Sequence, residues 1–380
     1  MADAFILEAL RTPIGKKKGA YTFIRPDDLA AKCLNGLVER AKVDPAHVED
    51  VVMGCVTQIG EQGLNIGRTA PLAAGWPVSV PGTSVNRMCG SSLQATNFAA
   101  QAVMAGAMDL TVGAGVESMT RVQMGGDAGA ISDGITDRFD VIGQGMSAEL
   151  IAEKYGFVRL DLDRLAVESH RRALQAIDNG WFKREILPVE VPGPKGDRHL
   201  VTTDEGPRKG STLESVGALK PAFRENGVVT AASSSQISDG AAAILIGNRE
   251  KAAELGVKPR ARFRSMAVAG TDPTLMLLGP GPATMLALKK AGLTVGDIDL
   301  FEVNEAFASV VLCWQRDTGA SLEKTNVNGG AMALGHPLGC SGARLLVTLL
   351  HEMERRDVAL GLATLCIGFG QAVATIIERV

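Results

Sequence analysis

One cysteine lies where its thiol could act as a nucleophile. Cys89 follows a short strand pattern that ends at residues 84–85, and it precedes a Gly-Ser-Ser turn into an Ala-rich helix pattern over residues 91–105. The unpaired N–H groups and partial positive charge of a helix N-terminus favour thiolate over thiol and can bind an oxyanion. Free cysteines are also commonly small buried residues. The local sequence therefore leaves open a nucleophile or a packing residue in a tight turn.

One of the five histidines has a comparable setting. His336 lies in NGGAMALGHPLGCSGAR, with glycines on both sides and a proline after it. Glycine allows another backbone or a ligand to approach closely. A lone histidine is more often structural than catalytic, but this position before a helix favours catalysis. There the imidazole could accept a proton from a cysteine or polarise a carbonyl.

Two further residues lie at the ends of strand patterns. Cys366 closes the last buried strand pattern in LCIGFGQA, and the glycines after it predict a loop whose N–H groups point into a site. Asn304 lies at a strand-to-helix turn, where it could cap the helix, orient a water, or do both. The remaining cysteines are interpreted as packing or structural residues. No pair of cysteines has CxxC spacing, so a zinc ribbon is not predicted.

Strand and helix patterns alternate at both ends of the chain, which predicts a layered α/β architecture. Between residues 118 and 235 the alternation of strand and helix patterns stops. A long helix pattern over 161–178 is followed there by the Pro/Gly-rich stretch 191–198. This insertion either covers a substrate or is a plain surface excursion. Strand patterns cover residues 4–7, 51–56, 109–116, 300–303 and 359–365, and helix patterns cover residues 28–40, 64–74, 91–105, 283–291, 305–315 and 341–353.

The two α/β parts echo each other. Val85-Asn86 leads through a glycine-containing turn into a helix and then a strand, and Val327-Asn328 does the same. A duplication would place Cys89 and His336 at equivalent helix entrances, facing one another.

Composition excludes several function classes. At about 150 residues per domain, 380 residues predict two to three domains, and 46% hydrophobic with 21% charged residues is typical of a soluble globular protein. The net charge of −3 and 4% aromatic residues do not favour nucleic-acid binding. No secretory signal and no apolar run long enough for membrane insertion is present, so we expect a cytoplasmic, reducing location.

Several long motifs, in order, give the chain a family resemblance. They are RTPIGKKKG, NRMCGSS, SSQISDGAAA, EVNEAFA, NVNGGAMALGHPLGCSGAR and CIGFGQA. Together they resemble the thiolase family, the CoA-dependent acyltransferases that make or cleave 3-ketoacyl-CoA, essentially from end to end. The resemblance implies acetyl-CoA C-acyltransferase activity, most simply thiolytic cleavage of 3-ketoacyl-CoA in fatty-acid β-oxidation.

The resemblance also implies roles for the site residues. Cys89 is the nucleophile that becomes acylated, and His336 takes its proton and binds the thioester oxygen. Cys366 is the second acid/base, and Asn304 holds a catalytic water. The N–H groups of Cys89 and Gly368 form an oxyanion hole. Coenzyme A is a co-substrate, and no metal or redox cofactor is expected.

Positions for coenzyme A follow from the same resemblance. Arg208 matches the position near the adenine and phosphate end, where a guanidinium suits phosphate. Ser215, Leu219 and Phe223 match the adenine pocket, and Ser235 matches a pantetheine contact. The alternative for Arg208 is a solvated surface charge in a loop.

The implied fold has five layers, α-β-α-β-α, built from two similar five-stranded halves and an inserted loop domain. The first half covers residues 1–117 plus about 236–258, the loop domain 118–235, and the second half 259–380. A homodimer or homotetramer is expected. Coenzyme A and acyl-CoA are the expected partners, and neither nucleic-acid binding nor membrane insertion is expected.

The last motif departs from the family pattern at two positions. Phe369 and Ala372 stand where the family commonly has glycine, and Phe369 is expected to narrow the site or shift substrate preference. The alternatives are a biosynthetic acetoacetyl-CoA thiolase and a weakly catalytic, thiolase-like protein that binds CoA esters. A ketoacyl synthase would use two histidines where this chain offers His336 and Cys366.

Overall fold

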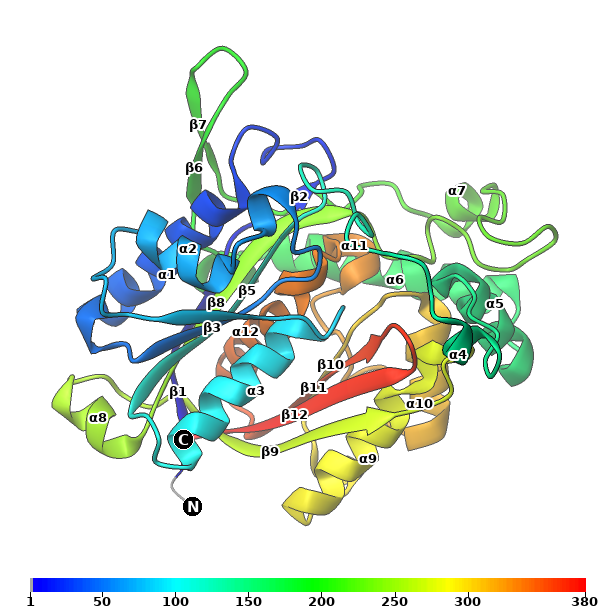
Figure 1. Cartoon of the computed structure of the whole chain (residues 1–380). Coiled ribbons are helices and arrows are strands. Elements are labelled where there is room, and N and C mark those ends of the chain that lie inside the picture. The colour runs from blue at the N-terminus through cyan, green and yellow to red at the C-terminus, as the bar shows by residue number, and fades with distance from the viewer. Residues whose placement is uncertain (1–2) are drawn as a thin grey trace.

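The computed structural model describes residues 3–380, and Figure 1 shows their arrangement. Ten strands form one mixed sheet in the order β10-β11-β12-β9-β1-β8-β5-β3-β4, with the short β2 paired to β8, and β6 and β7 form a separate hairpin. The strands are β1 (Phe5–Arg11), β2 (Gly15–Lys16), β3 (Asp50–Gly54), β4 (Gly82–Val85), β5 (Leu110–Ser118), β6 (Val189–Pro192), β7 (Arg198–Val201), β8 (Ser238–Gly247), β9 (Ala261–Gly270), β10 (Leu300–Val303), β11 (Leu360–Ile367) and β12 (Gln371–Arg379).

Helices cover the sheet and extend from one end of it. They are α1 (Pro26–Ala41), α2 (Ile66–Ala73), α3 (Ser91–Met104), α4 (Asp133–Thr136), α5 (Gln144–Tyr155), α6 (Arg159–Asp178), α7 (Leu213–Gly217), α8 (Arg249–Glu254), α9 (Pro280–Ala291), α10 (Ala308–Thr318), α11 (Ala331–Leu334) and α12 (Leu338–Arg356). None of these helices combines the length and the apolar composition needed to cross a bilayer.

The strand pairing repeats in the two parts of the chain. In the first part β3 is parallel to β5, β5 is antiparallel to β8, and β8 is antiparallel to β1. In the second part β10 is parallel to β11, β11 is antiparallel to β12, and β12 is antiparallel to β9. The strands of the two halves pair with each other where Phe5 and Ile6 of β1 lie beside Arg262 and Ala261 of β9. The expected duplication is therefore visible in the topology.

The second half departs from five full strands. In the first half β4 runs parallel to β3. At the equivalent edge of the second half, a single parallel bridge joins Phe301 and Thr325. This half thus has four strands and a vestige of the fifth.

The helices and the sheet stack in layers because their apolar faces pack against one another. α3 and α12 pack against each other between the two halves, and their residues share one core with β1, β8, β11 and β12. α1 and α2 cover the outer face of the first half, and α9 and α10 cover that of the second (Figure 1). The result is the expected five-layered α-β-α-β-α fold.

The central position of α12 explains its charged residues. It is buried continuously from Gly339 to Met353. A buried charge needs a partner, and Arg344 lies 3.2 Å from Glu302 while Asn328 donates to Glu352 at 3.0 Å.

One helix begins later than its sequence pattern predicted. The pattern over 305–315 corresponds to α10, which starts at Ala308 because the chain before it pairs with the insertion instead. Phe307 is extended, with φ −146° and ψ 153°. Ser235 N donates to Ala306 O at 2.9 Å, and Ser234 bridges to Phe307.

Residues 119–237 form the insertion between β5 and β8. It contains α4 to α7 and the hairpin β6–β7, which projects from the body of the molecule in Figure 1. α5 packs against α10, and α6 packs against α11 and α10. The expected boundaries of the loop domain, 118–235, remain a prediction.

Candidate active site

A large, mostly apolar cavity lies where the insertion meets the two halves. Its volume is about 980 Å³, and Cys89 and His336 both line it. Cys89 precedes α3 and His336 precedes α12, so the two helix entrances face one space, as the duplication predicted. The insertion contributes much of the apolar lining, including Met119, Met124, Ile131, Ile135, Met146 and Phe223.

Cys89 lies in a tight, strained turn. The preceding Met88 has φ +45°, a conformation that costs energy in a residue with a side chain. Ser91 N and Gly90 N donate back to Met88 O and Arg87 O at 2.9 and 3.0 Å. A Cβ on Gly90 would lie 2.5 Å from Cδ1 of Ile367, so any side chain here would displace Ile367 where this turn meets β11.

The Cys89 thiol is protonated in the resting protein. Burial raises its pKa to about 11, against the lowering effect of the Gln144 side chain and of the N–H groups of Cys89 and Gly368; the Glu117 carboxylate raises it further. A thiol with this pKa needs a base to become nucleophilic at neutral pH.

His336 is a neutral imidazole suited to that task. Burial, assisted by the charge of Arg344, lowers its pKa to about 3. Its Nδ1 lies 2.6 Å from Ser341 Oγ, and its Nε2 lies 3.3 Å from Asn304 Nδ2. The ring is therefore held from both sides by neutral polar groups.

Asn304 is fully buried and points its amide at His336. Its Oδ1 has no hydrogen-bond partner among residues 3–380. This oxygen is available to accept a hydrogen bond from a water or a substrate group, which fits the predicted water-holding role.

The turn that carries Asn304 is anchored by Glu305. Ser169 Oγ donates to Glu305 Oε2 at 2.6 Å, Asn326 Nδ2 donates to Oε1 at 3.0 Å, and Met332 N donates to Oε2 at 3.2 Å. Asn326 also forms two 2.8 Å hydrogen bonds with the backbone of Val303. The helix α6 and the loop before α11 thus fix the backbone on both sides of Asn304.

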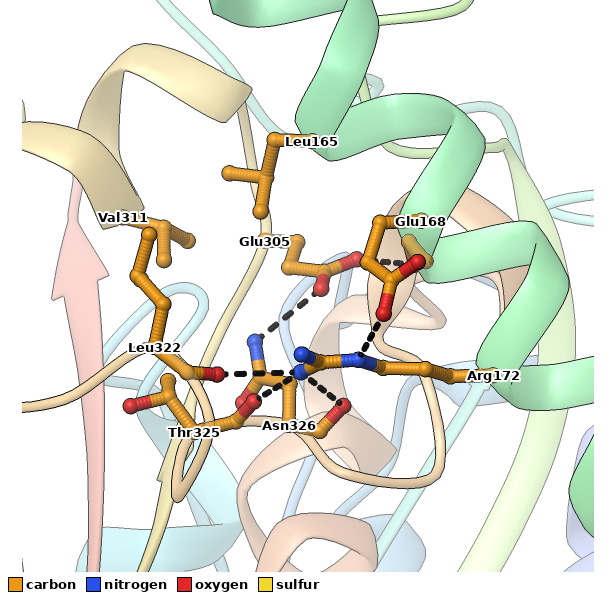
Figure 2. A pocket seen from close by; sticks show the side chains of 9 residues that line it. Leu165, Glu168, Arg172, Glu305, Val311, Leu322, Thr325 and Asn326 are labelled. Atoms are coloured by element: carbon orange, nitrogen blue, oxygen red, sulfur yellow. Dashed lines mark hydrogen bonds and ion pairs between the residues drawn. The ribbon is translucent and has the colours of Figure 1, made fainter. Parts of the chain in front are cut away.

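Figure 2 shows the outer part of this anchor, a small pocket between α6 and the loop at 322–326. Arg172 reaches across it and donates to the carbonyl oxygens of Leu322 and Thr325 at 3.1 and 2.6 Å. Its Nε donates to Glu168 at 2.7 Å. The pocket holds about 10 Å³ of free space, so it is part of the support and offers no room for a ligand.

Cys366 and Gly368 lie at the end of β11. Cys366 is buried, and burial raises its pKa well above the ordinary value, with smaller contributions from Cys89 and Cys313. Cys366 does not itself line the large cavity. The N–H of Gly368 faces the Cys89 sulfur and lowers its pKa. The two cysteines and the predicted oxyanion-hole glycine therefore meet at one point.

Phe369 lies in the turn between β11 and β12, and Ala372 lies among the first paired residues of β12. Phe369 has φ +58°, is 40% exposed and lines the large cavity. Ala372 is fully buried opposite Gly279, whose missing Cβ would lie 2.7 Å from the Ala372 methyl group. The alanine is thus accommodated by a glycine across from it, whereas Phe369 contributes its ring to the cavity wall.

The predicted coenzyme A residues divide between two cavities. Arg208, Ser215 and Leu219 line a second cavity of about 240 Å³, together with His170. Phe223 and Ser235 line the large cavity instead, and Phe223 packs edge-on against Phe307 at 5.7 Å. Gln236 lines both cavities, so they adjoin.

His170 supports the loop that carries Arg208. Arg208 N donates to His170 Nδ1 at 3.1 Å, which requires an unprotonated Nδ1. Burial and the Arg208 charge lower the pKa of His170 to about 4.

Sequence reasoning missed three residues that support the site. Gln144 contacts the nucleophile from the start of α5, and Ser341 contacts His336 from within GCSGAR. Glu117, at the end of β5, accepts hydrogen bonds from Val56 N, Gln62 Nε2 and Gly339 N at 2.9, 2.7 and 2.9 Å. An acidic residue directly after the buried strand pattern over residues 109–116 was a signal for Glu117. Gln144 had none, because it lies in the insertion.

The other cysteines lie where packing was predicted. Cys33, Cys55, Cys313 and Cys340 are buried and free. Across residues 3–380, no group of three or more His, Cys, Asp or Glu side chains is arranged to hold a metal ion.

Comparisons with known proteins agree with the geometry. A family model described as "Thiolase, N-terminal domain" matches residues 4–250, and one described as "Thiolase, C-terminal domain" matches residues 257–379. The chain is 46% identical to a 3-ketoacyl-CoA thiolase of Aliivibrio fischeri and 44% identical to one of Bacillus subtilis, over the full length of each pair. The crystal structure of the Bacillus anthracis acetyl-CoA acetyltransferase has 38% identity and a TM-score of 0.93, covering 100% of this chain and 99% of that one.

Proposed function

The chain belongs to the thiolase family, and from this premise we propose that it is an acetyl-CoA C-acyltransferase that cleaves 3-ketoacyl-CoA with coenzyme A. The observation that carries the proposal is that Cys89 and the neutral His336 line one apolar cavity, with the buried Cys366 directly behind Cys89. The products are acetyl-CoA and an acyl-CoA shortened by two carbons.

The first half-reaction forms an acyl-enzyme. His336 Nε2 takes the proton of Cys89, and the thiolate attacks the 3-keto carbon. The N–H groups of Cys89 and Gly368 bind the resulting alkoxide. The bond between C2 and C3 then breaks, and its electron pair becomes the enolate of acetyl-CoA. The protonated His336 and a water held by Asn304 bind the enolate oxygen, and the Cys366 thiol protonates its carbon.

The second half-reaction transfers the acyl group to coenzyme A. The Cys366 thiolate takes the proton of the coenzyme A thiol, and the new thiolate attacks the acyl-Cys89 thioester. The same two N–H groups bind the tetrahedral oxyanion. Cys89 leaves and recovers its proton from His336. Each proton is returned, so the cycle closes without a metal or redox cofactor.

Coenzyme A is proposed to extend from the large cavity to the second one. Ser235 then contacts its pantetheine arm, and Arg208, Ser215 and Leu219 hold the adenine and phosphate end. Phe223 was predicted to line the adenine pocket, but it lines the large cavity, and its contact is proposed to be with the pantetheine arm instead. The adjoining of the cavities at Gln236 supports this path. The guanidinium of Arg208 is the group best suited to a phosphate.

The size and apolar lining of the large cavity support a medium or long acyl chain and hence a role in fatty-acid β-oxidation. The names of the relatives from Aliivibrio fischeri and Bacillus subtilis support the same substrate class. Acetoacetyl-CoA is the second candidate, because the chain is also similar to an acetyl-CoA acetyltransferase.

A homodimer or homotetramer is proposed, with a cytoplasmic location. β4 is an edge strand, and such edges are open to pairing with another chain. Asn65 Nδ2 donates to Gly82 O of β4 at 2.9 Å, which places the neighbouring Leu64 beside this edge. The Leu64 side chain is 92% exposed. An exposed leucine beside an open strand edge favours an interface between copies of this chain.

The test is a thiolysis assay with 3-ketoacyl-CoA substrates of increasing chain length. We expect acetyl-CoA and the shortened acyl-CoA in equal amounts, and no turnover by Cys89→Ala. Turnover of acetoacetyl-CoA alone would assign the second candidate. Binding of CoA esters without product from any substrate would contradict the enzymatic proposal.

A further inference from the structure

Gln144 is an unassigned polar side chain at the nucleophile. It is the first residue of α5, directly after Gly143, which has extended backbone with φ −66° and ψ 149°. Its side chain lines the large cavity together with Cys89, Met88 and Phe369. Its Nε2 lies 3.4 Å from the point where a Cβ on Gly368 would stand. The amide nitrogen therefore sits beside the glycine whose N–H faces the Cys89 sulfur.

Position 368 is closely packed on the same side. A Cβ there would lie 2.7 Å from Met88 Sδ, so a side chain would displace Met88, whereas at 3.4 Å it would only touch the Gln144 amide. Gly368 thus provides an N–H donor at the sulfur, with the Gln144 amide within contact distance of it.

Three neutral donors lower the pKa of the Cys89 thiol, namely the Gln144 amide and the N–H groups of Cys89 and Gly368, and the amide lies on the same cavity wall as Cys89. Two titratable side chains besides Cys89 line the cavity, namely His336 and Asp127. Cys366 and Glu117 lie close to the Cys89 sulfur but do not line the cavity. Of the groups that lower the pKa of Cys89, Gln144 has the largest effect. Within residues 3–380, no protein group holds the Gln144 side chain in a hydrogen bond in the resting structure, so the amide has no competing structural partner and is free to donate to the thiolate when it forms.

We propose that the side-chain amide of Gln144 donates a hydrogen bond to the Cys89 thiolate and is a further catalytic residue of the thiolysis reaction. The inference rests on the proposed function, because it assigns Gln144 to the nucleophile of that reaction. A neutral donor stabilises the thiolate by a hydrogen bond. Unlike a positively charged group, it does not bind the thiolate so tightly that its nucleophilicity is lost.

The contact acts in both half-reactions. Cys89 is an anion when it attacks the 3-keto carbon and again when it leaves the acyl-enzyme. The sulfur of a thioester is a much weaker acceptor than a thiolate. The hydrogen bond therefore favours the charged states over the acyl-enzyme, which is the differential binding that accelerates a reaction.

The first test measures the Cys89 thiolate directly. Gln144→Met replaces the amide with an apolar chain of similar length and so removes the N–H donor alone, whereas Gln144→Glu keeps the shape and replaces the donor with a negatively charged carboxylate. Each variant is alkylated with iodoacetamide across a range of pH, and the Cys89 peptide is quantified by mass spectrometry. We expect Gln144→Met to raise the apparent pKa of Cys89 by about one unit, equivalent to about tenfold slower alkylation at a fixed pH below it, and Gln144→Glu to raise it further because like charges repel.

A matched control is Gln101→Met on the exposed side of α3. Gln101 Nε2 lies 3.6 Å from Met266 Sδ, away from the large cavity. This variant should keep the wild-type alkylation profile. Because Gln144 is at the partly open cavity wall, its variants should unfold at the wild-type temperature, and thermal unfolding checks this.

The second test is kinetic. Both Gln144 variants should lower kcat for thiolysis about tenfold and leave KM within about twofold. A wild-type alkylation profile in Gln144→Glu and Gln144→Met would overturn the inference even if the wild-type protein is a thiolase. Conversely, a shifted Cys89 pKa in a protein with no thiolysis would reject the proposed function and keep the hydrogen bond.

Discussion

His336 Nδ1 lies 2.6 Å from Ser341 Oγ, and the same hydroxyl lies 2.8 Å from Pro337 O. A carbonyl can only accept, so the single hydroxyl proton of Ser341 is donated to Pro337. Ser341 Oγ must then accept a hydrogen bond from His336 Nδ1–H. This fixes the tautomer: Nε2 carries the lone pair, on the side of Asn304, and is ready to take a proton.

Ser341 is therefore a positioning residue for the base. Ser341→Ala should lower kcat/KM by between about tenfold and a hundredfold, because a hydrogen bond to the imidazolium formed in catalysis is lost. The loss should fall on kcat, with KM little changed, in a steady-state thiolysis assay. Ser265→Ala is the control, since it removes a buried hydroxyl that donates to Ala287 O at 2.8 Å on the outer helix α9. Equal activities of the two variants would show that Ser341 has only a packing role.

Cys366→Ala should separate the two half-reactions. Cys89 keeps its base, so it should still be acylated, whereas the coenzyme A thiol loses its proton acceptor. We expect kcat to fall at least a hundredfold and acyl-Cys89 to accumulate, as followed by intact-protein mass spectrometry after mixing with acetyl-CoA. Cys313→Ala, at another buried cysteine, serves as the control. Normal turnover by Cys366→Ala would contradict its role as the second acid/base.

Phe369→Gly tests the cavity wall. The change removes a ring from the cavity and relieves a backbone held at φ +58°. We expect the ratio of kcat/KM for long-chain over short-chain 3-ketoacyl-CoA to rise about tenfold, the size expected for a change of pocket volume. Kinetics across a series of chain lengths measure this ratio. An unchanged ratio would mean that Phe369 does not set substrate preference.

His170 makes stability depend on pH. Its folded-state pKa of about 4 lies below the unfolded value of about 6.5, so the unfolded state binds more protons between these values. The contribution of His170 is fully present above pH 6.5 and is lost as pH falls toward 4, by up to about 3 kcal/mol. His170→Asn keeps an acceptor for Arg208 N but cannot titrate there. Urea unfolding at pH 7.5 and 4.5 should show a smaller loss of stability in the variant, and parallel losses would reject this account.

The core of the candidate site could be predicted because each residue marks a change of local structure. Cys89 and His336 each stand in a glycine-containing turn before a helix, and Cys366 ends a buried strand. Each of these positions can be recognised from its own segment of the sequence. The echo of the two halves then placed Cys89 and His336 on the same space, and both line the large cavity.

The supporting contacts could not be predicted in this way, because they join segments far apart in the chain. Gln144 reaches Cys89 from the insertion, and Glu117 ties β5 to Gly339 at the start of α12. Ser341 lies within the recognised motif GCSGAR, but its role in orienting His336 depends on the direction of one hydroxyl proton, which the sequence does not show. These relationships exist only after the layers have packed.

Part of the fold could be predicted because some helices and strands have long, clear patterns in the sequence. The buried helix α3 and strand β11 were found within two residues of their bounds, since their patterns are long. The start of α10 was predicted three residues too early, because Phe307 pairs with Ser234 and leaves the helical conformation. The strands β8, β9 and β12 complete the sheet but were not identified individually.

The most direct test of the central claim is whether Cys89 carries the acyl group. The wild-type protein is mixed with a 3-ketoacyl-CoA in the absence of free coenzyme A, quenched, digested and examined by tandem mass spectrometry. We predict an acyl group of the shortened chain length on the Cys89 peptide, its removal on addition of coenzyme A, and its absence in Cys89→Ala. An unmodified Cys89 peptide, under conditions in which the Bacillus subtilis 3-ketoacyl-CoA thiolase is acylated, would contradict the account.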